Sequence, residues 1–350
     1  MRDAKPETER DQPMIVLSNC LTQTADEGSL NVANSLIKRI KRENPETTIV
    51  TYERHSPMSD RHMTINKLLL NWDLIRLIGK KKESVLYVPF PARMLPTTLR
   101  MFVLSCFARW GMHTVLSMNV PPNGMARWLM KASGSRVSVL SKETWEMYRD
   151  LLGERVTYLK AGVDTQRFQP VDEAQKQILR EKYGLPQDKP IVLHVGHMRS
   201  GRNVLRMAEL QETWHGVLVV STLTLDEQEQ ELRRKLAECP NITIIDTYLE
   251  RIEEIYQLAD VYLFPVAESG HCIDVPLSAL EAAACGIPVV TTPYGEMREL
   301  VGNPGFYQIE SFVPQQLHML LTRAREERKN PRQYVLEYDW NCAVEKLLLK

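Results

Sequence analysis

Residues 259–290 have the sequence ADVYLFPVAESGHCIDVPLSALEAAACGIPVV, which contains one strand–helix–strand unit. The apolar run Val261–Phe264 predicts a buried strand, and the Leu- and Ala-rich stretch that begins near Leu277 predicts a buried helix. Pro288–Thr291 predicts the next strand. Two strands joined through a helix run parallel, so this segment predicts an α/β protein with a parallel sheet.

Apolar runs of strand length alternate with amphipathic stretches of helix length along almost the whole chain, which is typical of repeated βαβ units. The other expected strands are Met14–Ser18, Thr48–Tyr52, Ser84–Pro89, Thr114–Met118, Val137–Leu140, Ile191–Val195, Val217–Ser221 and Ile242–Ile245. The expected helices are Leu30–Arg42, Thr64–Ile78, Thr97–Arg109, Asn123–Lys131, Lys142–Leu152 and Val204–Thr213. His113 is expected to precede its strand and to be a surface or core histidine.

The 350 residues suggest two domains. A charged tail over residues 1–13 precedes a first domain at 14–160, and KAGVDTQRFQP at 160–170 interrupts the alternation with glycine and proline. We therefore expect a linker at 161–171 and a second domain at 172–335. The predicted fold class is α/β, with two Rossmann-like, doubly wound parallel-sheet domains facing a cleft, the usual ligand site of such folds.

The composition, with 43% hydrophobic and 25% charged residues, is that of an ordinary globular protein. Because 44 basic residues balance 44 acidic ones, no nucleic-acid partner is expected. Residues 51–150 contain 15 basic and 7 acidic side chains. Six scattered cysteines without a CxxC pair argue against a zinc site or a disulfide framework and favour a reducing cytoplasm. The charged N-terminus lacks the apolar core of a signal peptide.

Several common chemistries of α/β proteins lack their motifs here. Ser18–Ser29 follows the first strand with one glycine, whereas a dinucleotide-binding domain needs GxGxxG. The chain also has no GxxxxGK[ST] loop of P-loop NTPases and no GxSxG elbow of hydrolases. A DxD pair for metal-bound sugar nucleotides is missing. These absences argue against NAD-dependent, ATPase and common hydrolase functions.

Three segments together resemble the family 4 glycosyltransferases, which are retaining enzymes of the two-domain GT-B architecture. They are AGVDTQRFQP at 161–170, LHVGHMRSGRNVL at 193–205, and residues 259–290 quoted above. The end of the chain, YDWNCAVEKLLL at 338–349, is similar to the closing helix of that family. Residues 336–350 are therefore expected to form a closing helix that packs back toward the N-terminal domain.

The resemblance implies a donor site for a nucleoside diphosphate sugar. Arg202 and His197 stand where the family has a basic pair, and cations suit the charge of a departing diphosphate. His197 would be a cation only when protonated. Leu277 and Ser278 would lend backbone N–H groups to the diphosphate at the helix start. Glu281 resembles the carboxylate that accepts both ribose hydroxyls.

The N-terminal domain is expected to add one contact to the donor. The residues expected near the reacting sugar differ from those that the family usually has. Gly28 resembles the glycine that lets the backbone approach the diphosphate. The family usually has a glutamate eight residues before Glu281, where this chain has Ile273, so Asp274 or Glu268 is the candidate for holding the donor sugar. Asp274 is equally well placed to cap the following helix. Asn119 takes the place of a common histidine near the reacting carbon; it cannot shuttle protons, so the departing phosphate would act as base.

The resemblance therefore predicts a retaining glycosyltransferase that acts on a glycan, glycolipid or small-molecule acceptor, with no cofactor and no metal. The alternative is a non-catalytic GT-B protein that stabilises or recruits another glycosyltransferase. On the acceptor side, Tyr87–Met101 and Cys106–Lys131 mix Phe, Trp and Met with Arg and Lys. This mix is typical of helix packing edged by long basic side chains, or of a contact with a membrane surface. The expected location is the cytoplasm, with the inner membrane face as an alternative.

Overall fold

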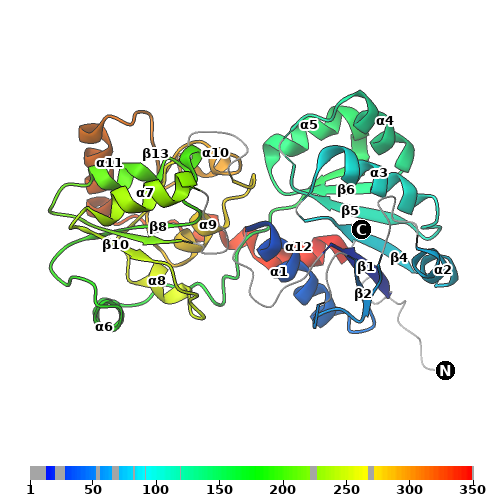
Figure 1. The fold of residues 1–350 in the computed structure, drawn as a ribbon, viewed down its shortest axis with the longest axis horizontal. Coiled ribbons are helices and arrows are strands. Elements are labelled where there is room, and N and C mark those ends of the chain that lie inside the picture. Colours follow the sequence, from blue (N-terminus) through cyan, green and yellow to red (C-terminus); the bar gives the residue numbers. More distant parts are fainter. Residues whose placement is uncertain are drawn as a thin grey trace, which may run out of the picture. The chain divides into compact units, whose positions relative to one another are not determined.

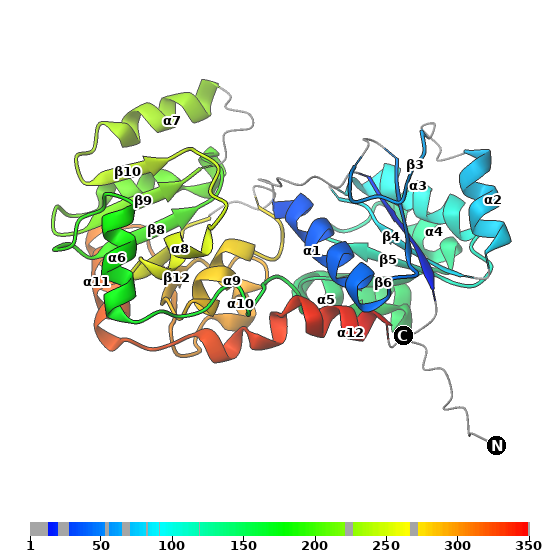
Figure 2. The ribbon, with the colours of Figure 1, turned by 90° about the horizontal axis from the view of Figure 1, so that it is seen from below.

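The computed structural model describes residues 13–19, 28–52, 56–64, 71–81, 83–90, 92–118, 120–220, 227–266 and 272–348. The chain divides into two compact units. Unit 1 comprises Met1–Ala161 and Trp340–Lys350, and unit 2 comprises Gly162–Asp339. Each unit contains one parallel sheet with helices on both faces (Figure 1 and Figure 2). The predicted α/β class with two doubly wound parallel sheets is therefore confirmed.

Unit 1 has seven described strands in the order β3-β2-β1-β4-β5-β6-β7. Their bounds are β1 Met14–Ser18, β2 Thr48–Thr51, β3 Arg61–His62, β4 Ser84–Val88, β5 Met112–Leu116, β6 Arg136–Val139 and β7 Val156–Tyr158. The helices are α1 Gly28–Glu43, α2 Trp72–Lys80, α3 Met94–Ser105, α4 Gly124–Ser133, α5 Lys142–Leu152, η2 Gly153–Arg155 and α12 Trp340–Leu348. α3 and α4 cover one face of the sheet, while α1 and α12 cover the other (Figure 1).

The end of the chain completes unit 1. α12 packs against α1 and buries Trp340, Val344 and Leu347. Asn341 Oδ1 accepts hydrogen bonds from Arg39 at 2.9 Å and from Arg42 at 2.8 Å. α1 and α12 come from opposite ends of the sequence. Each helix therefore buries its whole apolar face only when both segments are present.

Unit 2 has six described strands in the order β10-β9-β8-β11-β12-β13. Their bounds are β8 Ile191–Val195, β9 His215–Val219, β10 Ile242–Ile245, β11 Val261–Phe264, β12 Val289–Thr291 and β13 Phe306–Gln308. The helices are α6 Glu173–Lys182, η3 Ser200–Arg202, η4 Val204–Glu209, α7 Glu227–Ala237, α8 Glu253–Gln257, α9 Leu277–Ala284, α10 Met297–Leu300, α11 Pro314–Glu327, η5 Arg332–Tyr334 and η6 Leu336–Tyr338. The strand order reverses between β8 and β11, so the loops after these two strands meet at the carboxyl edge of the sheet.

Some local expectations were wrong. The strand expected at Val217–Ser221 is β9, which begins two residues earlier, and the helix expected at Thr97–Arg109 is α3, which begins at Met94. The strand expected at Thr114–Met118 is β5, two residues earlier, because Met112 pairs in register with Val85 of β4. His113 therefore lies inside the strand, where its Nε2 is 2.8 Å from Ser138 Oγ. The helix expected at Val204–Thr213 is instead the short 3-10 helix η4, which follows the left-handed backbone of Asn203 at φ 55°. An i, i+3 apolar spacing suits a 3-10 helix as well as an α-helix.

Five of the cysteines, Cys106, Cys239, Cys272, Cys285 and Cys342, carry free thiols. Among the described residues, no helix combines the length and the apolar character needed to cross a bilayer.

Candidate functional site

The candidate site lies in unit 2, at the carboxyl ends of β8 and β11. β8 ends at Val195 and leads into Gly196, whose N–H donates to the Val219 carbonyl at 2.9 Å. Gly196 has φ +153°, and a Cβ at this position would collide with Nη1 of Arg202. The turn favours glycine for its backbone conformation, and the absent side chain leaves the room that the Arg202 guanidinium occupies.

Arg202 ends the 3-10 turn η3, and its N–H donates to the Arg199 carbonyl at 2.9 Å. Burial, and then the charges of Arg202 and Arg199, lower the pKa of His197 to about 4. His197 is therefore neutral at pH 7 in the ligand-free protein. The structure brings together the two residues that the sequence singled out, and makes Arg202 the permanent cation of the pair.

His194 is a buried neighbour that the sequence did not single out. Its Nδ1 donates to the Leu263 carbonyl at 2.9 Å, whereas its Nε2 has no hydrogen-bond partner among the described residues. Burial lowers its pKa to about 4, and the charge of Arg202 adds to this effect. A histidine inside an apolar strand gives no sequence signal that separates it from an ordinary core residue.

The start of α9 is tied to the ends of both strands. Leu277 and Ser278 form its first turn after Pro276, which supplies no side-chain cap. Ser278 hydrogen-bonds the Tyr262 hydroxyl, which lies 3.3 Å from the Val195 carbonyl oxygen. The first N–H groups of a helix have no acceptor within the helix, so α9 presents donors at the same edge of the sheet as Arg202.

Glu281 lies one turn further along α9 and is held by Tyr256 of α8. The buried Tyr256 hydroxyl donates to Glu281 Oε2 at 2.6 Å. Burial raises the pKa of Glu281 to about 7, although the Tyr256 hydrogen bond and the charge of Arg167 favour the carboxylate. Among the described residues this bond occupies one of about four acceptor positions of the carboxylate, so the other positions can accept hydrogen bonds from a ligand.

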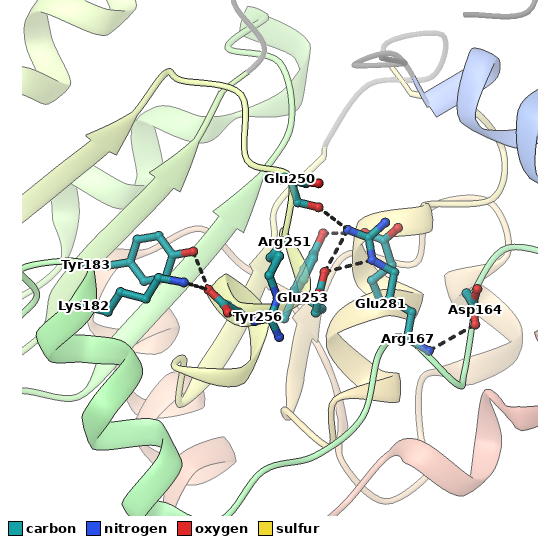
Figure 3. Close-up of polar contacts among 10 residues, drawn as sticks. Asp164, Arg167, Lys182, Tyr183, Glu250, Arg251, Glu253, Tyr256 and Glu281 are labelled. Atoms are coloured by element: carbon teal, nitrogen blue, oxygen red, sulfur yellow. Dashed lines mark hydrogen bonds and ion pairs between the residues drawn. The ribbon is translucent and has the colours of Figure 1, made fainter. Parts of the chain in front are cut away.

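Arg167 reaches toward Glu281 from the segment before α6 (Figure 3). Its Nη2 donates to the Glu250 carbonyl at 2.8 Å, and its Nε donates to Glu253 Oε2 at 2.8 Å. These contacts, which include an ion pair with Glu253, hold Arg167 near the Glu281 carboxylate, to which it makes no direct ion pair within the part of the chain that the structure describes. The arrangement stabilises the charged form of Glu281 through space.

The remaining predicted residues have different placements. Asp274 is only 2% exposed, and its carbonyl accepts a hydrogen bond from the Glu296 N–H at 2.8 Å. It does not cap α9, because the N-cap residue is Pro276. Gly28 begins α1 in unit 1. Glu268 and Asn119 lie outside the described residues.

The comparisons with known proteins concern the same part of the chain. Residues 189–321 match the family model for glycosyl transferases group 1. This segment is similar to the group 1 glycosyltransferases. It runs from the start of β8 into α11, so the group 1 segment contains Arg202, the start of α9 and Glu281. The predicted resemblance to a glycosyltransferase family is confirmed.

Relatives and solved structures agree with this assignment. The putative teichuronic acid biosynthesis glycosyltransferase TuaC of Bacillus subtilis is 26% identical over 200 residues, which are 56% of this chain and 48% of TuaC. The chain thus spans about half the length of this curated relative. A Rickettsia africae glycosyltransferase superposes with a TM-score of 0.76 at 14% identity, covering 97% of both chains. Anabaena HepE in complex with UDP and glucose gives 0.71 at 13% identity, covering 95% of this chain and 97% of HepE. At these identities the two structures establish the GT-B fold.

Proposed function

We propose that this protein is a retaining glycosyltransferase that moves a sugar from a nucleoside diphosphate sugar to a glycan or lipid-linked acceptor. The observation that carries the proposal is the arrangement in unit 2 of a cation, a helix start and an oriented carboxylate. These are Arg202 packed over Gly196, the first turn of α9, and Glu281 held by Tyr256. All three lie within the group 1 segment.

The diphosphate would bind between Arg202 and the start of α9. Negative charge grows on the diphosphate as the sugar bond breaks, and a fixed guanidinium with backbone N–H groups stabilises that charge without reorganising. His197 is neutral in the free protein and would serve as a hydrogen-bonding group at pH 7.

The ribose would bind to Glu281. A carboxylate accepts hydrogen bonds from two neighbouring hydroxyls, and the Tyr256 hydrogen bond to Oε2 holds the group in one orientation. Because the pKa of Glu281 is about 7, two further donors from the ribose would stabilise its charged form and lower that pKa. Nucleotide binding therefore releases a proton near neutral pH.

The chemistry at the sugar is assigned by resemblance. Asp274 or Glu268 would hold the donor sugar and Asn119 would contact its hydroxyls. The departing phosphate would accept the proton of the attacking acceptor on the same face of the sugar, which retains the anomeric configuration. TuaC is named for teichuronic acid biosynthesis, and HepE was solved with UDP and glucose. Those names support a sugar nucleotide as donor and a glycan as one class of acceptor.

Isothermal titration with UDP, GDP, ADP and dTDP tests the donor site. Arg202→Ala and Glu281→Ala should each weaken binding of the preferred nucleotide at least tenfold, since each removes a contact to a charged group. Arg325→Ala and Glu326→Ala, on the exposed side of α11, are matched controls and should leave the affinity unchanged. Equal affinities for the site variants and the controls would overturn the site assignment.

A non-catalytic donor-binding protein is the second candidate, and one observation favours it. Ile273 stands where the family usually has its first glutamate, and the neighbouring Asp274 is buried. Incubation with the preferred nucleotide sugar without acceptor separates the two candidates. Slow release of free sugar, lost in Arg202→Ala, supports an enzyme, whereas nucleotide binding without any release supports the non-catalytic role.

A further inference from the structure

One surface of unit 1 combines exposed apolar side chains with exposed cations. α3 and α4 pack side by side on one face of the sheet, and the rings of Phe102 and Trp128 lie 5.5 Å apart. We define the α3–α4 surface by the apolar residues Leu95, Leu99, Phe102, Met125 and Trp128, with the cations Arg93, Arg127 and Lys131 beside them. It lies outside the unit 2 donor site.

The apolar residues of this surface are presented to solvent. Leu95 is 41% exposed, Met125 is 63% exposed and Trp128 is 61% exposed. Leu95, Leu99 and Phe102 recur at i, i+4 and i+7 along α3, and Met125 and Trp128 at i and i+3 along α4. Residues at such spacings share one side of a helix, so the two helices expose adjoining apolar stripes. No other described part of unit 1 covers these apolar side chains.

The charged residues of α3 and α4 are all basic. From Ser84 to Lys142 the chain has no Asp or Glu and seven basic residues. Arg93, Arg127 and Lys131 are exposed and form no ion pair among the described residues, whereas exposed arginines of unit 2 such as Arg251 and Arg323 pair with glutamates. Long basic side chains next to an apolar stripe can place their stems on apolar material and their charges on anionic groups.

We propose that the α3–α4 surface docks on an anionic lipid bilayer. Exposed tryptophan and methionine between lysine and arginine match the boundary between acyl chains and charged headgroups. A second copy of this chain fits the surface less well, because a two-fold contact would place these cations against one another with no carboxylate between them. The proposal concerns unit 1 and stands independently of the donor site in unit 2.

Sedimentation with vesicles tests the proposal on the full-length protein. Vesicles of phosphatidylcholine with about 30% phosphatidylglycerol should bind the protein at low salt, and pure phosphatidylcholine vesicles should bind it at least tenfold more weakly. Each basic side chain at an anionic surface contributes roughly fivefold to partitioning. Raising the salt to about 0.5 M should therefore release most of the protein, because charges are screened over a few ångströms. Equal partitioning onto both vesicle types would overturn the proposal.

Variants with matched controls locate the contact. Trp128→Ala with Met125→Ala should weaken partitioning about tenfold, and Arg127→Glu with Lys131→Glu should abolish it. The controls are Met319→Ala and Arg325→Glu on α11, where Met319 is 70% exposed and Arg325 is also exposed, and they should partition like the parent protein. Thermal unfolding confirms that each variant folds. Partitioning that survives all four substitutions, or falls equally in the controls, contradicts the assignment.

Sedimentation velocity without lipid distinguishes the two other possible occupants of the surface, a second copy of this chain and an acidic protein. A dimer that dissociates in Trp128→Ala, together with no vesicle binding, would assign the surface to a second copy. A monomer that binds neither vesicle type would leave an acidic protein as the occupant. Either result overturns the bilayer, while the nucleotide titrations of unit 2 remain unaffected.

Discussion

At the scale of single residues, the proposed ribose-binding role of Glu281 opposes the stability of the fold. Burial raises its pKa to about 7 from an ordinary value of 4.5. The folded protein therefore keeps a proton that the unfolded chain releases between these pH values, and stability falls as the pH rises through that window. The carboxylate costs about 3 kcal/mol above pH 7.

Substituting Glu281→Gln isolates this cost. The neutral amide should raise the free energy of unfolding by about 3 kcal/mol at pH 8 and leave it almost unchanged at pH 4.5, where the native residue is already protonated. Nucleotide affinity should fall at least tenfold in the same variant. Urea unfolding at the two pH values measures the first effect, and an equal change at both would show that the pKa of Glu281 is not raised.

The role of Tyr256 is tested by Tyr256→Phe. Its hydroxyl stabilises the Glu281 carboxylate by a 2.6 Å hydrogen bond, so the variant should protonate Glu281 more readily. In the proposed site, the midpoint of nucleotide affinity against pH should move upward by about one pH unit, and affinity should recover at pH 9. Tyr183→Phe is the control, because Tyr183 donates to Glu254. A loss of affinity that is the same at every pH would indicate a purely structural role for Tyr256.

The sequence could identify some of these residues but not the others. Arg202 and Glu281 stand in segments whose order resembles a family, so the sequence alone singles both of them out. Tyr262 and His194 sit in two of the expected buried strands, whereas Tyr256 sits in α8, for which the sequence predicted no element. Whether a buried ring turns its polar atom toward a site depends on side-chain packing, which a pattern of apolar residues does not determine.

At the scale of elements, the pattern of apolar residues also does not determine where every helix or strand begins and ends. The predicted spans Lys142–Leu152 and Ile191–Val195 coincide with α5 and β8 because turn-forming residues flank both. β5 begins two residues before its predicted start, since the apolar run continues in both directions and pairing with β4 decides the register. The local sequence identifies a strand, and pairing with the neighbouring strand determines its first and last residues.

Arg332 in η5 joins three elements and predicts a loss of stability on substitution. Its guanidinium donates to the Phe168 carbonyl at 2.7 Å, to the Thr165 carbonyl at 2.8 Å and to the Ala284 carbonyl at the end of α9. Arg332→Ala should lower the free energy of unfolding by about 2–4 kcal/mol, because buried carbonyls lose a charged donor. Urea unfolding beside the exposed Arg325→Ala measures this, and equal stability of the two variants would show that water replaces the guanidinium.

At the scale of the whole molecule, the described donor-site residues of the group 1 segment and the chain end belong to different units. Arg202, the start of α9 and Glu281 are in unit 2, whereas Trp340–Lys350 belongs to unit 1. The chain therefore forms most of unit 1 first, then unit 2, and finally the last helix of unit 1. Damage to α12 should weaken unit 1 without changing the geometry of the proposed nucleotide site in unit 2.

Val344→Asp tests this separation. Val344 of α12 is fully buried, and an unpaired carboxylate there should lower the free energy of unfolding by about 3–5 kcal/mol. Nucleotide affinity, measured by titration well below the unfolding temperature, should stay within about threefold of the parent. Lys346→Gln, on the exposed side of α12, is the matched control and should change neither quantity. If Val344→Asp abolished nucleotide binding while the protein remained folded, the donor site would depend on α12 and could not be assigned to unit 2 alone.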